Sequence, residues 1–405
     1  MKKILDQSLL AEEKDAFAIL NTLTTTYTNL ERNNPNIPSL INLSIGNPDV
    51  VPNAYWLNRL AYHVQNPELH GYGKFNLEIN DNLKSKFAAY HYRRFQKNKD
   101  RQVLNYKEEV LDLLGSKEGI FYTLFSILSP GDKILIPNPS YSVYRSVAQL
   151  VQAEVVPVNL KDNGNPDLES ISREDVLASK ILVLCSPDNP TTHLLDEDYL
   201  KHVIDFCKKN AILVILDLAY AQIAFDSTNL PCSILALKGG SDVAVELHSL
   251  SKSCSLAGWR IGFIAGNKKV LAKIDKIKSQ IDFGMFLPLQ KVAIELLDKM
   301  EKESTIQKDV YDKRLSFWIF SMSKIGWKIS KPKAGFFLWC KLPEAFPIAD
   351  DIEFVEKMLL ATGVLVTPGS GFGSGGSGYI RIALVQDLKQ LEIACHRIKK
   401  WLDKF

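Results

Sequence analysis

Short apolar segments alternate with longer amphipathic segments through the middle of the chain. The apolar segments are rich in Val, Ile and Leu without polar alternation, which is typical of strands buried on both faces of a parallel sheet. We therefore predict strands at 133–136, 181–185, 212–216, 243–247 and 261–265. Two amphipathic segments, 119–129 and 198–210, place apolar residues at helical spacing. This alternation predicts an α/β domain with a mostly parallel central sheet and right-handed crossovers.

The two ends of the chain follow a different pattern. Residues 1–40 are mostly helical in pattern and close with a turn rich in Pro and Asn at 33–38. A long helical pattern covers 290–325, short strands are expected at 336–340 and 379–384, and a loop rich in Gly and Ser covers 369–378. We expect a large domain over residues 46–289 and a smaller α/β domain that combines 1–45 with 290–405.

Composition is that of an ordinary globular protein. The 405 residues suggest two to three domains of about 150 residues each. The chain is 46% hydrophobic and 23% charged, which excludes a mainly disordered protein. The 49 basic and 46 acidic residues nearly balance, which argues against a nucleic-acid partner. The six cysteines lack the paired spacing of a metal site or a disulfide framework.

No segment of the sequence predicts a secretory signal or a membrane span. Residues 1–15 carry charge throughout and lack the apolar core of a signal peptide. The longest apolar stretch, 211–225, has Asp217 in its middle and falls short of the roughly 18 residues of a span. We therefore predict a cytoplasmic protein with reduced thiols.

Polar side chains follow three of the predicted strands directly. Asn189 comes after strand 181–185, Asp217 after 212–216, and Lys252 after 243–247. Ligands of open α/β sheets bind at the carboxyl ends of the strands, so we expect these side chains to converge. A lysine there can form a Schiff base with a carbonyl compound. Taken singly, a loop lysine is usually solvated and a lone aspartate usually caps a turn, so the prediction depends on the convergence.

Groups near Lys252 predict an anion site. Ser249 and Ser251 offer hydroxyls, and Arg260 lies between apolar residues at the start of the next strand. An arginine in such a setting usually holds an anion or a carboxylate. The segment 114–119 opens a helix with Gly115, and free N–H groups at a helix start bind anions, although plain N-capping is the commoner use.

Two further residues have a functional and a structural interpretation. Tyr141 follows strand 133–136 and lies either flat on an aromatic ligand or in the core. Arg381 lies among apolar neighbours in strand 379–384. An arginine so placed suits bidentate capture of a carboxylate, and the alternative is an ion pair between the domains.

Together and in order, these motifs resemble the class I and II pyridoxal-phosphate-dependent aminotransferases, of the aspartate aminotransferase fold type. The resemblance runs from about residue 41 to the end of the chain. Its motifs are Asn-Pro-Thr at 189–191, Asp-Leu-Ala-Tyr at 217–220, Ser-x-Ser-Lys at 249–252 followed by Arg260, and Tyr-Ile-Arg at 379–381. The resemblance implies a fold-type-I transferase that is a homodimer and uses pyridoxal 5′-phosphate.

The resemblance also implies catalytic roles. Lys252 would form the internal aldimine and carry the proton between the substrate and the cofactor. Asp217 would pair with the pyridinium nitrogen, so that the ring acts as an electron sink. Tyr220 and Asn189 would bond the cofactor's O3′, and Tyr141 would stack on its ring.

Binding roles follow from the same resemblance. The residues implied to hold the phosphate are Ser116, Lys117, Ser249, Ser251 and Arg260. Tyr72 would reach this phosphate across the dimer interface. Arg381 would grip the substrate α-carboxylate, with help from the Gly46 amide and from Asn189.

Within the family, the sequence is similar to the bacterial alanine (glutamate–pyruvate) aminotransferases at 217–220, 250–253, 256–260 and 282–290. This implies a ping-pong exchange of alanine and 2-oxoglutarate for pyruvate and glutamate. LL-diaminopimelate and N-succinyl-diaminopimelate aminotransferases share Gly-Ser-Lys-Glu-Gly at 115–119 and are the first alternative. An aspartate aminotransferase or a carbon–sulfur lyase is less favoured, and a DNA-binding regulator would need a basic module that is not apparent.

Substrate choice is expected to depend on residues around Ile45, Tyr72 and 283–286. The segment 281–287 contains no Arg or Lys, which favours a small neutral substrate. Lys117 and Lys74 are the nearest cationic candidates for a second substrate carboxylate. The sequence departs from the family at Thr192 and Ala334, where Gly is usual, and in the short segment 73–79.

Overall fold

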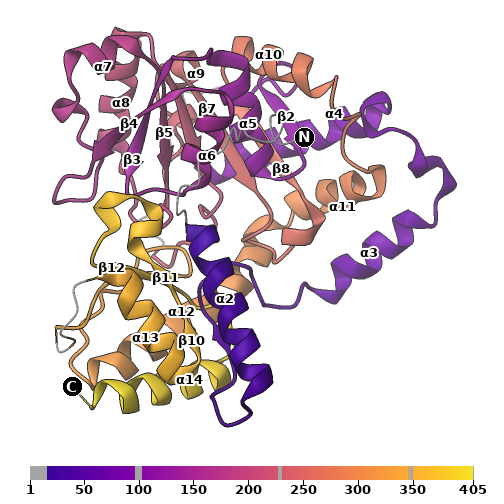
Figure 1. Ribbon diagram of the computed structural model, residues 1–405. Helices are drawn as coiled ribbons and strands as arrows, with labels where there is room; N and C mark the ends of the chain where they lie inside the picture. Colours follow the sequence, from indigo (N-terminus) through magenta and orange to yellow (C-terminus); the bar gives the residue numbers. More distant parts are fainter. Residues whose placement is uncertain (1–15, 96–102, 227–229, 345, 347–349, 405) are drawn as a thin grey trace, which may run out of the picture.

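The computed structural model describes residues 16–95, 103–226, 230–344, 346 and 350–404. A seven-stranded sheet crosses the larger part of the molecule in the order β2-β8-β7-β6-β5-β3-β4 (Figure 1). Five neighbouring strands are parallel, namely β7 (Ala244–Ser249), β6 (Leu213–Asp217), β5 (Ser179–Cys185), β3 (Lys133–Asn138) and β4 (Glu154–Asn159). The predicted α/β class with a mostly parallel central sheet is confirmed.

One predicted strand runs in an unexpected direction. The strand at 261–265 is β8 (Gly262–Gly266), which is antiparallel to β7 and to β2 (Val110–Leu113). Only residues 250–261 join β7 to β8, and they contain no crossover helix, so the chain cannot return to start a parallel strand. The amino end of β8 therefore lies at the same edge of the sheet as the carboxyl end of β7.

Helices cover both faces of the sheet (Figure 1). Strand β5 shows why, because its alternate residues enter two separate hydrophobic clusters. Ile181 and Val183 pack with residues of α5, α6 and α10, whereas Leu182 and Leu184 pack with residues of α4, α8 and α11. These helices are α4 (Leu77–Phe95), α5 (Ser116–Ile127), α6 (Val143–Leu150), α8 (Glu197–Asn210), α10 (Lys268–Lys278) and α11 (Leu287–Leu297). The shorter α3 (Ala54–Val64), α7 (Arg173–Ala178) and α9 (Gly240–Val243) complete this part.

A second hydrophobic core combines segments from both ends of the chain. Tyr27 of α2 (Ala16–Asn33) shares a cluster with Trp318 of α12 (Met300–Ser323), Phe354 of α13 (Asp351–Thr362) and Leu391 of α14 (Leu388–Leu402). Its strands are the antiparallel β11 (Thr367–Pro368), β12 (Tyr379–Ala383) and β9 (Phe337–Lys341), with β1 (Ile41–Asn42) parallel to β10 (Val364–Leu365). Figure 1 shows α2 beside these orange and yellow elements.

The expected domain boundaries at 45/46 and 289/290 stay a prediction. The helical pattern at 290–325 is two helices, α11 and α12, with a break at residues 298–299. Helix α11 packs in the larger core through Val292 and Leu296, so it lies on the side of the large domain. The helical expectation for residues 1–40 holds for α2, and residues 1–15 lie outside the described part of the chain.

The departures from the family pattern have visible consequences. Thr192 has a φ of 61°, a left-handed conformation that glycine adopts at little cost and a β-branched residue adopts with strain. Ala334 is buried and pairs with Ala224 in a β-bridge, so its methyl group is accommodated. None of the helices in the described residues is long and apolar enough to cross a membrane.

Candidate active site

A pocket of about 390 Å³ lies at the carboxyl edge of the large sheet. Strands β5, β6 and β7 are neighbours, so Asn189, Asp217 and Lys252 lie on one wall of it. Because β8 is antiparallel, Arg260 at its amino end joins the same wall. Arg381 enters from β12 of the smaller part, so the pocket lies between the two cores.

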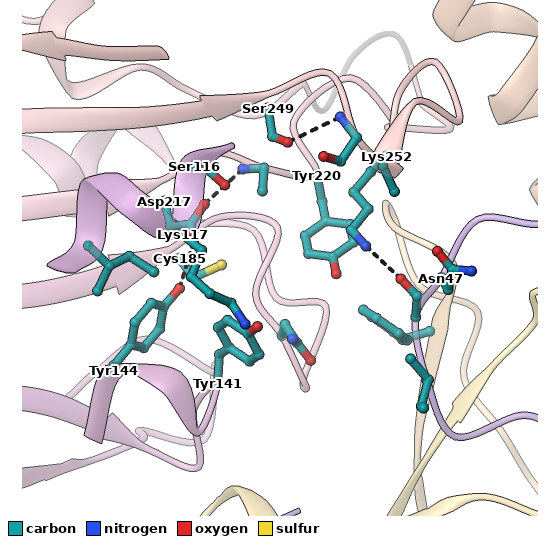
Figure 2. Close-up of a pocket in the computed structure, with 18 of the residues that line it drawn as sticks. Asn47, Ser116, Lys117, Tyr141, Tyr144, Cys185, Asp217, Tyr220, Ser249 and Lys252 are labelled. Atoms are coloured by element: carbon teal, nitrogen blue, oxygen red, sulfur yellow. Dashed lines mark hydrogen bonds between the residues drawn. The ribbon is translucent and has the colours of Figure 1, made fainter. Parts of the chain in front are cut away.

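The structure brings almost all of the predicted site residues together (Figure 2). Those that line the pocket are Gly46, Ser116, Lys117, Tyr141, Asn189, Asp217, Tyr220, Ser249, Ser251, Lys252, Arg260 and Arg381. Tyr72 is the exception, because it does not line the pocket of this single chain. Its side chain is 66% exposed and forms an aromatic cluster with Phe75 and Phe283 at the molecular surface.

The amine of Lys252 projects into the middle of the pocket. Its Nζ donates a hydrogen bond to the Gly46 carbonyl oxygen at 2.6 Å and lies 6.0 Å from the centre of the Tyr220 ring. Burial, together with the positive charges of Arg381 and Arg260, lowers the pKa of Lys252 to about 8. Lys252 thus has a much larger neutral fraction near neutral pH than an ordinary lysine, and the neutral amine is the form that attacks a carbonyl carbon.

The lowered pKa predicts a change in stability when Lys252 is replaced by Met. The folded-state pKa of about 8 lies below the ordinary 10.5, so the stability contribution of this amine is present above pH 10.5 and is lost as the pH falls through 8. We expect Lys252→Met to raise the free energy of unfolding of the cofactor-free protein at pH 7 by up to about 3 kcal/mol. Urea unfolding at pH 7 and pH 10 checks this, because the gain must shrink at pH 10. An equal gain at both values would contradict it.

Asp217 is a buried carboxylate at the end of β6, only 5% exposed. The Ala219 N–H donates to its Oδ1 at 3.0 Å, and the Tyr144 hydroxyl donates to its Oδ2 at 2.9 Å (Figure 2). Burial raises the pKa of Asp217, and these two hydrogen bonds oppose the rise. No salt bridge of the described residues includes Asp217, so its charge is available to a cationic group of a ligand.

An anion cradle lies beside this wall. A Cβ on Gly115 would lie 1.9 Å from Nη2 of Arg260, and a Cβ on Gly262 would lie 2.7 Å from the Ser116 backbone nitrogen. Two glycines therefore let the guanidinium and the amino end of α5 approach each other. Ser249 at the end of β7 and Ser251 in the turn that follows add hydroxyls. Helix N–H groups, hydroxyls and an arginine are the donors that a phosphate needs.

Arg381 is a buried cation without a carboxylate partner among the described residues. Its guanidinium donates to the Asn189 side-chain oxygen at 2.7 Å and to the Ser44 carbonyl oxygen, and its Nε has no partner. The guanidinium lies 4.3 Å from the ring centre of Phe337 and 4.7 Å from that of Phe372. Burial lowers the pKa of Arg381 to about 10. Arg381 thus forms no inter-domain ion pair within the described part of the chain, and a ligand carboxylate would supply the missing charge.

The phenols of the pocket are buried and neutral. Tyr220 packs edge-on against Phe336 and Phe337, with ring centres 5.5 and 5.4 Å away. Burial raises the pKa of Tyr141 to about 12 and that of Tyr220 well above 10. Both hydroxyls therefore remain hydrogen-bond donors at physiological pH.

Sequence reasoning missed several residues that line the pocket, chiefly Phe17, Tyr144, Cys185 and Phe337. Tyr144 comes one helical turn after Tyr141, and Cys185 ends a predicted strand, so the pattern carried a signal for both. Phe17 and Phe337 had no such signal, because they reach the pocket from α2 and β9 of the smaller part.

Candidates for substrate selection are only partly in the pocket. Ile45 lines it, whereas Phe283 and Phe286 are 44% and 42% exposed and lie outside it in this chain. Lys74 forms a salt bridge with Asp275 at 2.9 Å. Lys117 lines the pocket with its Nζ 5.9 Å from the ring centre of Tyr141, and burial and Arg260 lower its pKa. Lys117 is therefore the better candidate for a second carboxylate.

A buried cluster of polar side chains packs against β7 and connects it to α4. Glu246 accepts hydrogen bonds from His91 of α4, from Ser233 and from the Leu235 N–H, and lies 3.1 Å from Nε2 of His248. Burial raises the pKa of Glu246, but hydrogen bonds from the two histidines outweigh burial and hold it well below its usual range. The cluster ties α4 to the strand that ends in Ser249.

The pocket fits pyridoxal 5′-phosphate, the cofactor that the resemblance implies. The anion cradle matches a phosphate, and the unpaired carboxylate of Asp217 matches a protonated ring nitrogen. The amine of Lys252 lines the same pocket and matches an aldehyde. These three groups differ in chemistry and lie along one wall of the pocket, which is what one elongated ligand of this kind requires.

Comparisons with known proteins agree with this fit. A family model described as aminotransferase class I and II matches residues 38–398. An LL-diaminopimelate aminotransferase of Natranaerobius thermophilus is 37% identical over 361 residues, which is 89% of this chain and 91% of that protein. The glutamate-pyruvate aminotransferase AlaC of Escherichia coli is 33% identical, over 89% of this chain and 86% of that protein.

A solved structure extends the likeness to three dimensions. The probable N-succinyldiaminopimelate aminotransferase of Thermus thermophilus has a TM-score of 0.85 and 30% identity, over 95% of this chain and 99% of that one. Fold, pocket and sequence therefore lead to one conclusion, that the chain belongs to the class I and II aminotransferases, enzymes that use pyridoxal 5′-phosphate.

Proposed function

We propose that this enzyme exchanges the amino group of alanine or glutamate with pyruvate or 2-oxoglutarate in a ping-pong reaction. The observation that carries the proposal is the placement of Lys252 and Arg381 in one pocket, an amine of lowered pKa beside a buried cation without a carboxylate partner. Pyridoxal phosphate, when bound, supplies an aldehyde for amino groups and a ring that withdraws electrons from the substrate's α-carbon.

The residues of the chain supply proton transfer and hold the cofactor and the substrate. Lys252 would carry the proton between the substrate's α-carbon and the cofactor, in opposite directions in the two half-reactions, for which its lowered pKa is suited. Asp217 keeps a proton on the ring nitrogen, and Arg381 holds the α-carboxylate with Asn189 and Gly46 nearby. Ser116, Ser249 and Arg260 would hold the phosphate, Tyr141 would stack on the ring, and Tyr220 would hydrogen-bond the ring's O3′.

LL-Diaminopimelate is the alternative amino donor. Several of the relatives are LL-diaminopimelate aminotransferases, with one glutamate-pyruvate aminotransferase among them. The pocket offers no side-chain clamp from the segment 281–287, which favours a small neutral donor. Lys117 at the pocket wall suits the second carboxylate of glutamate or 2-oxoglutarate, the shared partner substrates in our proposal.

A substrate series decides between the two donors. Purified enzyme in the aldehyde form is mixed with alanine, glutamate, aspartate or LL-diaminopimelate, and conversion to the amine form is followed by absorbance. We expect alanine and glutamate to give the highest kcat/KM of the four substrates. If LL-diaminopimelate exceeds alanine by about tenfold, or about 1.4 kcal/mol, the alternative replaces our proposal.

Replacing Lys117 with Met is expected to raise the KM for glutamate by about tenfold and to leave the KM for alanine within about twofold. The reason is that only glutamate carries a second carboxylate, and an exposed charge pair at a pocket wall contributes up to about 1 kcal/mol, more when partly buried. Lys74→Met is the matched control, because Lys74 pairs with Asp275 outside the pocket. Equal losses for both substrates would assign Lys117 to the cofactor alone.

Replacing Arg381 with Ala is expected to weaken alanine and glutamate alike. Both half-reactions present an α-carboxylate to the same guanidinium, and losing one partner of a buried charge pair costs about 2–5 kcal/mol. This corresponds to a loss in kcat/KM of about 30-fold or more. Arg381→Lys should recover little of the lost kcat/KM, because an ammonium group lacks the planar pair of donors with which a guanidinium binds a carboxylate. A loss confined to one substrate in steady-state assays would contradict the assignment.

The functional unit in this proposal is a homodimer. The exposed aromatic cluster of Tyr72, Phe75 and Phe283 would be covered by the second copy, and Tyr72 would reach the other copy's phosphate. Light scattering at assay concentration tests the dimer. Pairing a Tyr72→Phe chain with a Lys252→Ala chain tests the shared site, because only a mixed dimer can contain one pocket with both residues intact. A cytoplasmic location stays a prediction from the sequence.

A further inference from the structure

Tyr144 makes a contact that the roles assigned so far do not use. It belongs to the first turn of α6, is 1% exposed, and donates its hydroxyl proton to Oδ2 of Asp217 at 2.9 Å. Its ring packs edge-on against Tyr141, with centres 5.6 Å apart and an angle of 88°. The phenol is thus fixed from the side, with its one proton directed at the buried carboxylate (Figure 2).

We propose that Tyr144 is a positioning residue that holds the Asp217 carboxylate in one orientation and in its ionised form before the cofactor enters. The proposal rests on the proposed role of Asp217 as partner of the ring nitrogen. Tyr144 itself acts through Asp217.

The hydrogen-bond inventory around Asp217 supports this role. Oδ1 is held by the Ala219 N–H and Oδ2 by Tyr144, so rotation of the carboxylate would break both bonds. Ala219 is part of the same turn as Asp217 and moves with it. Tyr144 is the donor that comes from another element, so it fixes the carboxylate relative to the rest of the pocket.

The protonation states of the groups around Asp217 also support this role of Tyr144. The titratable side chains near Asp217 are Tyr141 just before α6, Tyr144 in its first turn, Cys185 at the end of β5, Asp188 just after it, Tyr220 from its own turn, and Lys252. Burial raises the pKa of Cys185 well above 9 and that of Tyr144 well above 10, so both stay neutral. Burial also favours the protonated form of Asp217, which the Tyr144 hydroxyl opposes. Without that hydroxyl, Asp217 should take up a proton at a higher pH and lose its charge.

The experiment measures cofactor affinity by titrating cofactor-free protein with pyridoxal phosphate from pH 6 to 9. We expect Tyr144→Phe to weaken binding about tenfold near pH 7, and the difference to fade as the pH rises and Asp217 ionises without help. In an Asp217→Asn background, adding Tyr144→Phe should change the affinity less than about twofold, because the carboxylate it acts on is gone.

A matched control separates this role from ordinary packing. Tyr199 is also a buried tyrosine with one hydrogen bond, from its hydroxyl to the Pro166 carbonyl oxygen at 2.8 Å, and it does not line the pocket. Tyr199→Phe removes a comparable bond and should leave the pH profile of cofactor affinity unchanged. A Tyr144→Phe protein that binds within twofold of the wild type at every pH overturns the proposal, as does an equal loss in both backgrounds.

Two further outcomes remain decisive. If Tyr144→Phe fails to fold while Tyr144→Phe/Asp217→Asn folds, the proposal is supported, because the unsupported carboxylate is then the cause. If both fail, Tyr144 serves packing and the proposal is overturned. Wild-type protein that forms no covalent link to the cofactor would instead refute the proposed function of the pocket, so the two failures are distinguishable.

Discussion

Replacing Lys252 with Ala is expected to abolish transamination, with kcat falling by at least about four orders of magnitude, as for other residues that enter the chemistry directly. Lys252 lines the pocket together with Asp217, and burial with the charges of Arg381 and Arg260 lowers the pKa of its amine to about 8. Tyr141 and Tyr220 cannot take the proton in its place, because burial holds both phenols neutral. The rate of a single half-reaction, followed by absorbance, checks this.

Cofactor binding provides the control for Lys252→Ala. The cradle formed by Arg260 and the start of α5 is untouched, so the variant should still hold pyridoxal phosphate without a covalent link. Borohydride reduction followed by mass spectrometry should attach the cofactor to Lys252 in the wild type and in Lys117→Met, and not in Lys252→Ala. Full activity of a Lys252→Ala preparation free of other aminotransferases would refute the assignment.

Replacing Asp217 with Asn is expected to slow the half-reaction by about 100-fold or more while most of the cofactor stays bound. The substitution keeps the size of the side chain and removes the charge, and one preorganised electrostatic contact contributes about 2.7–4 kcal/mol to a transition state. The phosphate cradle and Lys252 still hold the cofactor. Stopped-flow half-reactions and cofactor content, measured on the same preparation, separate chemistry from binding.

Asp188 supplies the matched control for Asp217→Asn. It lies just after β5, whereas Asp217 ends the neighbouring β6, and it does not line the pocket. Its carboxylate accepts hydrogen bonds from the N–H and the hydroxyl of Thr191. Burial raises the pKa of Asp188 to about 6, which shows that its charge is disfavoured at this place, so removing the charge should cost little. Asp188→Asn should leave the half-reaction rate within about threefold of the wild type, on the scale of substitutions that touch no reacting group. An unchanged rate in Asp217→Asn would refute the pairing with the ring nitrogen.

The sequence by itself determined the sheet and most of the pocket wall. Buried strands of a parallel sheet must be apolar on both faces, and that requirement made β3, β5, β6 and β7 visible as continuous runs of Val, Ile and Leu. Residues that follow such strands must lie at one edge, which predicted the convergence of Asn189, Asp217 and Lys252. Both edge strands of this sheet, β2 and β4, were missed, and β4 is only partly buried.

Motif resemblance added the residues that no local pattern could assign. Arg260 and Arg381 are single cations among apolar neighbours, and pattern alone left their partners open. The family likeness implied a phosphate for the first and a substrate carboxylate for the second. Their geometry agrees with ligand binding, since the guanidinium of Arg381 has no carboxylate partner in the described residues.

Only the tertiary structure decided the direction of β8, the packing of α11 and the far wall of the pocket. The short connection after β7 forces β8 to run antiparallel, and this places Arg260 beside Lys252 rather than at the opposite edge. Phe17 lies more than 100 residues before Lys252 in the sequence, and Phe337 belongs to a different sheet. Local periodicity carries no information about contacts of this kind. Tyr144 became significant only through its hydrogen bond to Asp217, because a contact between α6 and β6 depends on how a helix packs on a sheet and not on the spacing of residues along the chain.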